Sequence, residues 1–97
     1  MSELIDKQVL VTTEYRGVFG GRLVEWDRAT RTAVLAEARN CTYWPKECKG
    51  FLGLAAVGPV EGARIGPSVD RLELAGVTSI SPMTGAAAKK WSSAPWN

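Results

Sequence analysis

The sequence predicts an α+β fold, in which a small bent antiparallel sheet forms a half-barrel, with a short middle helix and a short C-terminal helix. The first half of the chain consists of segments rich in Val and Thr that alternate with polar turns, as is typical of antiparallel strands. Gly20 and Gly21 fall inside one of these segments, and a glycine pair permits the bulge or bend that curls a small sheet. Helical spacing begins only after Pro45, which ends any strand.

Five segments are expected to form strands, each bounded by turn or loop residues. The polar stretch DRATR separates the second strand from the third, and Gly76 separates the last two. The expected strands are residues 8–13, 18–26, 32–40, 71–75 and 77–81.

Two short helices are expected in the second half of the chain. Within residues 50–57, Phe51, Leu54 and Ala55 have the i, i+3, i+4 spacing of a helical face. A loop rich in Gly and Pro follows at 58–67. Thr84 is a candidate N-cap for a helix at residues 85–92.

All 97 residues are expected to form one domain, residues 1–97, because a chain of this length supports a single hydrophobic core. The opening MSELIDK has no basic segment followed by an apolar run, so no signal peptide is expected. No apolar run approaches the roughly 18 residues that a membrane span requires. We therefore expect a cytosolic protein with no membrane partner.

The composition argues against an enzyme and against a metal site. The chain has no histidine, which removes the commonest general base and metal ligand. Cys41 and Cys48 form a C-x6-C pair that lacks the further ligands of a zinc site, and they are expected to be reduced thiols. The net charge of +2 is too small to indicate bulk nucleic-acid binding, and no DNA partner is expected. No cofactor is implied.

The segment NCTYWPKECKGF, residues 40–51, concentrates aromatic rings and lysines. Aromatic rings stack on bases, and arginine and lysine contact phosphates, so this composition fits a nucleotide pocket. The candidate ligand-binding residues are Phe19, Arg39, Asn40, Tyr43, Trp44, Lys49, Phe51 and Arg64.

Structural roles compete with binding roles for several of these residues. Trp44 and Phe51 are also candidates for the core, Arg39 for a surface ion pair, and Lys49 for a solvated side chain. Neighbouring side chains alternate along an extended chain, so at most one of Tyr43 and Trp44 points into a core. Trp91 and Trp96 are expected to cover the sheet or a subunit interface.

The order of several blocks resembles a phage family. These blocks are GVFGGRLVE, EARNCTYW, GFLGLAAVGP, RIGPSV, LELAGVTSISPMT, AAAKKW and PW, and they span nearly the whole chain. In this order they are similar to the Thoeris anti-defence proteins of the first type and their short relatives.

The resemblance implies a sponge that sequesters cyclic nucleotide signals of host immunity without cleaving them. The implied ligands are cyclic ADP-ribose isomers and, in some members, cyclic di- or trinucleotides. It also implies self-association into dimers and hexamers, and action in the host cytoplasm. The family often has Asn-Ala-Arg before its Tyr-Trp pair, whereas this chain has Glu37-Ala38-Arg39, so Arg39 matches the family pattern, Glu37 departs from it, and the identity of the ligand stays open.

A second resemblance points to a different class. The segment GRLVEWDRATRTAVLAEA is similar to the bent-strand motif of Sm proteins, with a Gly, a Leu two residues later, an Asp turn and a second apolar strand. The second Sm signature near the C-terminus is absent. The alternative function is therefore an Sm-like small β-barrel that binds single-stranded RNA.

Overall fold

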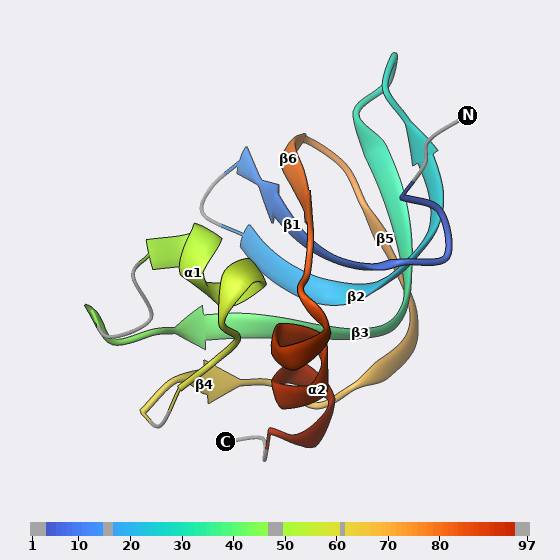
Figure 1. Cartoon of the computed structure of the whole chain (residues 1–97). Helices are drawn as coiled ribbons and strands as arrows, with labels where there is room; N and C mark the ends of the chain where they lie inside the picture. The colour runs from blue at the N-terminus through green and yellow to red at the C-terminus, as the bar shows by residue number, and fades with distance from the viewer. Residues whose placement is uncertain (1–3, 15–16, 47–49, 61, 95–97) are drawn as a thin grey trace.

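The computed structural model describes residues 4–14, 17–46, 50–60 and 62–94 (Figure 1). Its strands are all antiparallel to their neighbours, and β3 lies at the junction of the sheet. Going outward from β3, β2, β1 and β6 follow in order on one side. On the other side, β5 pairs with Ala33–Ala38 of β3 and β4 pairs with its last residues, Cys41 and Tyr43. The strands are β1 Gln8–Thr13, β2 Gly17–Asp27, β3 Thr32–Tyr43, β4 Arg64–Ile65, β5 Val69–Leu74 and β6 Val77–Pro82.

The bend expected at the glycine pair is present. The register between β2 and β3 shifts between Gly20 and Arg22, and shifts again between Leu23 and Glu25. A Cβ atom on Gly21 would lie 2.9 Å from the carbonyl oxygen of Ala36, so the two backbones approach too closely for a side chain. These irregularities curl the sheet, as bulges do in small barrels.

The helices α1 (Gly50–Ala56) and α2 (Gly85–Ser93) lie next to each other on the sheet (Figure 1). Thr84 caps α2 as expected, because its hydroxyl accepts a hydrogen bond from the Ala87 amide at 3.0 Å. The same hydroxyl donates to the carbonyl of Ala56 at 2.9 Å and so joins the two helices. The indole N–H of Trp91 adds a second link, to the carbonyl of Leu54, at 3.0 Å.

Buried side chains lie on both faces of the sheet and form two core clusters. Along β1, Val9 and Val11 enter one cluster and Leu10 enters the other, as the alternation of a strand requires. The cluster inside the curl contains Val9, Val11, Leu23, Ala33, Leu35, Ala38, Leu74 and Val77. The cluster under the helices contains Leu10, Val18, Cys41, Leu54, Ala55, Ile65 and Trp91.

The fold class predicted from the sequence is confirmed. The strand at 8–13 has the predicted bounds, and the other predicted elements differ at their ends by a few residues. Trp91 is buried in the core cluster under the helices, and Trp96 lies outside the described residues. Among the described residues, neither helix has the length and apolar character needed to cross a membrane.

Candidate functional site

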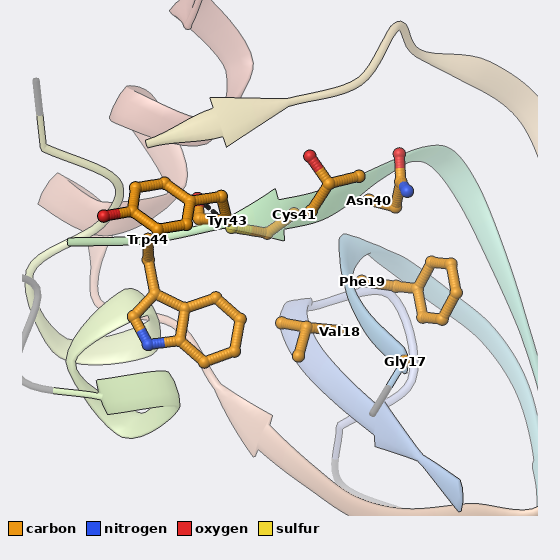
Figure 2. Close-up of a pocket in the computed structure, with 8 residues that line it drawn as sticks. Gly17, Val18, Phe19, Asn40, Cys41, Tyr43 and Trp44 are labelled. Atoms are coloured by element: carbon orange, nitrogen blue, oxygen red, sulfur yellow. Dashed lines mark hydrogen bonds between the residues drawn. The ribbon is translucent and has the colours of Figure 1, made fainter. Parts of the chain in front are cut away.

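A cleft of about 490 Å³ opens where the end of β3 meets the start of β2 (Figure 2). We call it the aromatic cleft. Its lining is mostly apolar, and none of its described side chains carries a charge. It is lined by Gly17, Val18, Phe19, Asn40, Cys41, Thr42, Tyr43 and Trp44.

Tyr43 and Trp44 have different surroundings at this cleft. The Tyr43 side chain is 53% exposed, whereas Trp44 is half-buried and packs against the core cluster under the helices. Figure 2 shows the Trp44 indole pointing from the end of β3 toward Val18. The prediction that at most one of the two rings enters the core is confirmed, and Tyr43 is the more exposed of the two rings.

Phe19, Asn40 and Cys41 line the cleft and also contact other parts of the fold. Phe19 is half-buried, packs against the cluster inside the curl, and is paired through its backbone with Asn40. The main-chain carbonyl of Asn40 accepts a hydrogen bond from the main-chain N–H of Gly66 at 2.8 Å. The side-chain oxygen of Asn40 lies where a Cβ atom on residue 66 would be, so this position requires glycine. The buried thiol of Cys41 donates to the carbonyl of Tyr43 at 3.3 Å, which supports a structural role for this cysteine.

Arg64 lies beside the cleft rather than inside it. A second hollow of about 590 Å³, the Arg64 hollow, is lined by Thr42, Tyr43, Gly62 and Arg64. Strand β4 sets this position, since Arg64 pairs with Tyr43 and its carbonyl accepts from the Thr42 hydroxyl at 3.3 Å. The Arg64 side chain is exposed, and no ion pair within the described part of the chain involves it.

Arg39 does not have the role expected from the sequence. Its side chain is only 8% exposed. Nε donates to the carbonyl of Gly66 at 2.7 Å, and Nη1 donates to the carbonyl of Trp91 at 2.8 Å. Burial lowers the pKa of the Arg39 guanidinium. Arg39 lies outside the aromatic cleft and braces β3 against α2, so the expected phosphate contact is corrected to a structural one.

Glu37 also lies outside the lining of the aromatic cleft. It lies at a bulge of β3 with a φ of 47°, a left-handed conformation that Asn adopts more readily than Glu. Its carboxylate pairs with Arg22, with Nε 3.4 Å from Oε1, and this hydrogen bond raises the pKa of Arg22. The backbone conformation therefore gives a structural reason for an asparagine at this position.

The remaining predicted site residues lie at the limit of the described structure. Lys49 is outside the described residues. Phe51 belongs to α1, but its side chain is not among those described. Of the predicted set, the structure brings together Phe19, Asn40, Tyr43 and Trp44 in the aromatic cleft, with Arg64 adjacent.

Sequence reasoning missed Gly17, Val18, Cys41 and Thr42, which line the aromatic cleft. Thr42 precedes Tyr43 in β3. A predicted strand that continued beyond residue 40 would have placed Thr42 next to the candidate Tyr43. Gly17 and Val18 come from the start of β2, and only the pairing of β2 with β3 places them there.

Five of the described acidic residues form ion pairs with arginines. Asp6 and Glu37 pair with Arg22, Glu14 pairs with Arg31, and Glu25 and Glu73 pair with Arg71. No described Asp or Glu lines the aromatic cleft or the Arg64 hollow, so an anionic ligand meets no described acidic side chain there. Within the described ranges, no group of three or more potential metal ligands is present.

Comparison with solved structures shows that the fold is that of Sm proteins. A heptameric archaeal Sm protein is 20% identical, with a TM-score of 0.55 over 84% of this chain and 93% of that chain. An Sm protein of Pyrococcus abyssii in complex with a uridine heptamer is 24% identical, with a TM-score of 0.54 over 82% of this chain and 87% of that chain. The SmAP1 heptamer of P. aerophilum is 21% identical, with a TM-score of 0.55 over 86% of both chains.

No curated protein matches the sequence. A family model matches residues 6–91, which include every strand and most of α2. The chain therefore belongs to the family described as a domain of unknown function, DUF6948.

Proposed function

We propose that this protein is a non-enzymatic binding module that holds unpaired RNA at the aromatic cleft. The observation that carries the proposal is the position of Tyr43, whose exposed ring borders both the apolar cleft and the Arg64 hollow. A base stacked on the ring enters the cleft, and the adjoining phosphate meets the Arg64 guanidinium. Stacking of this kind contributes about 1–3 kcal/mol per base.

The Sm fold supports this choice of ligand. One of the similar structures is an Sm protein in complex with a uridine heptamer. The low net charge of +2 is compatible with a site in which stacking contributes more than phosphate contacts. A site that contacts one or two phosphates has a shallow salt dependence, about −0.7 per phosphate on a log–log plot.

A cyclic nucleotide is a second candidate, following the resemblance to the anti-defence sponges. The volume of the aromatic cleft favours this candidate, because about 490 Å³ is within the roughly 300–1,000 Å³ of small-molecule pockets. Tyr43 and Arg64 would then stack on a purine and contact a phosphate of a ligand that is bound intact and sequestered.

We also propose that the protein self-associates. In the described sheet β5 pairs only with β3 and β6 pairs only with β1, so each strand has one edge without a partner strand. Pairing of such edges between copies satisfies the open backbone groups. Two of the similar Sm structures are described as heptamers, whereas the anti-defence resemblance favours dimers and hexamers.

The test measures binding of a labelled uridine heptamer, cyclic ADP-ribose and a cyclic dinucleotide to the wild type and three variants. If the proposal holds, the heptamer binds, and Tyr43→Ala and Arg64→Ala each weaken binding about 10- to 100-fold. Arg28→Ala is the matched control, because Arg28 is an exposed cation in the turn between β2 and β3, and it should leave binding unchanged.

Each other outcome contradicts part of the proposal. Binding of a cyclic nucleotide but not of the heptamer selects the second candidate. Heptamer binding that depends on Arg28 and not on Tyr43 places the RNA elsewhere on the fold. Absence of binding by all three ligands rejects both candidates.

A further inference from the structure

A third hollow adjoins the aromatic cleft on the side away from Arg64. We call it the hydroxyl hollow, and its volume is about 590 Å³. It is lined by Thr12, Thr13, Gly17, Val18, Trp44, Thr78 and Ser79. Four of these seven residues carry hydroxyl groups, and the remaining surface is the Trp44 indole with Val18 and Gly17.

Neighbouring hollows share lining residues and are therefore adjacent, and we call the three together the groove. Thr42 and Tyr43 line both the Arg64 hollow and the aromatic cleft. Gly17, Val18 and Trp44 line both the aromatic cleft and the hydroxyl hollow. Tyr43 therefore lies between the Arg64 hollow and the aromatic cleft, and Trp44 lies between the aromatic cleft and the hydroxyl hollow. The two residues are consecutive in the sequence, at the end of β3.

The chemistry of the groove changes along its length. One end has the exposed guanidinium of Arg64. The middle is apolar and aromatic. At the other end the Thr12 hydroxyl is 2.8 Å from that of Thr78 and 2.5 Å from that of Ser79. Each hydroxyl has one donor and two acceptor positions, so this cluster has hydrogen-bonding capacity beyond its internal bonds.

We propose that the groove holds three consecutive unpaired nucleotides, one in each hollow, with Tyr43 and Trp44 between successive bases. This inference rests on the proposed RNA-binding function and extends it. Arg64 contacts the phosphate at one end, and the hydroxyls of Thr12, Thr78 and Ser79 bind the polar edge of the nucleotide at the other end. Each hollow is within the size range of a small-molecule site.

The two aromatic rings of the groove, and a described lining without acidic side chains, favour an RNA strand over other elongated ligands. No described Asp or Glu lines any of the three hollows. Aromatic rings accept any base face, so the groove should bind unpaired strands with little preference for base sequence in its middle position. Selectivity is expected at the hydroxyl end, where hydrogen bonds are directional.

The first experiment measures the affinity of uridine oligonucleotides that increase in length from one to six residues. After correction for the number of binding registers, affinity should rise about tenfold with each added residue up to three and then become constant. A plateau at one residue would overturn the three-nucleotide groove and leave the proposed function intact. Absence of binding at every length would reject both.

The second experiment tests the hydroxyl end with Thr78→Val, which removes a hydroxyl and preserves the shape of an exposed side chain. This variant should weaken binding of the trinucleotide about three- to tenfold, equivalent to one lost hydrogen bond, and leave binding of the mononucleotide unchanged. Thr30→Val, at an exposed threonine in the turn between β2 and β3, is the control for hydroxyl loss elsewhere. Equal trinucleotide affinity for Thr78→Val and the wild type would remove the hydroxyl hollow from the site.

Discussion

Arg39 and Arg64 carry the same guanidinium group, and their surroundings give the two side chains different roles. Arg39 is buried and donates to two main-chain carbonyls, one in the segment after β4 and one in the last turn of α2. A cation near the C-terminal end of a helix also interacts favourably with the helix dipole. Arg64 is exposed next to an aromatic ring, where its donors are available to a ligand.

Arg39→Ala should destabilise the fold by roughly 2–4 kcal/mol, because the carbonyls of Gly66 and Trp91 lose a charged donor in a buried environment. For a domain of this size, this corresponds to a fall in Tm of roughly 10–25 °C. Thermal unfolding followed by circular dichroism measures the change. Arg64→Ala is the control, and its effect should be within about 0.5 kcal/mol because its side chain is exposed.

The opposite pattern would contradict the structural role of Arg39. An Arg39→Ala variant that unfolds like the wild type but binds nucleotide more weakly would instead support the phosphate contact that the sequence suggested for Arg39.

At the scale of elements, α2 depends on a glycine of β2. A Cβ atom on Gly20 would lie 2.7 Å from the Met83 methyl group and 2.9 Å from two ring carbons of Trp91. Met83 is flexible, but the Trp91 ring is buried and its indole N–H is bonded to Leu54. The absence of a side chain at Gly20 therefore allows α2 to approach the sheet.

Gly20→Ala should cost about 1–3 kcal/mol, because the added methyl group forces the Trp91 ring and α2 away from β2. Gly85→Ala makes the same chemical change in the first turn of α2, where an added Cβ meets no atom within 4 Å. That control should leave the free energy of unfolding unchanged or raise it by about 0.5 kcal/mol. Urea unfolding measures both variants. Equal stability of the two variants would show that Gly20 does not set the position of α2.

Local sequence signals predicted the elements that local interactions define. The Val-rich strand at 8–13 and the helix capped by Thr84 are examples, since alternation and capping act over a few residues. β4 was missed because two residues carry no periodic pattern, and its strand character comes from pairing with Cys41 and Tyr43. The role of Arg39 was missed because its partners are 27 and 52 residues away in the sequence.

For the molecule as a whole, the described part of the sheet has two open edges, one on β5 and one on β6. β5 and β6 occur at opposite ends of the strand order β5–β3–β2–β1–β6. An edge that pairs with a different edge on the next copy generates a ring if the rotation between copies closes. The groove lies at the end of β3, so every copy in such an assembly would contribute one groove of its own.

Light scattering of the purified protein should therefore give a mass of at least twice the 10.5 kDa of one chain at micromolar concentration. Val69→Lys, at the half-exposed start of β5, should lower that mass, because a lysine on an edge strand opposes edge-to-edge pairing. Val57→Lys makes the same change directly after α1, where the side chain is also exposed, and should leave the mass unchanged. A wild-type mass of 10.5 kDa would reject self-association, and a loss of mass only in Val57→Lys would move the contact from the sheet edge to the region of α1.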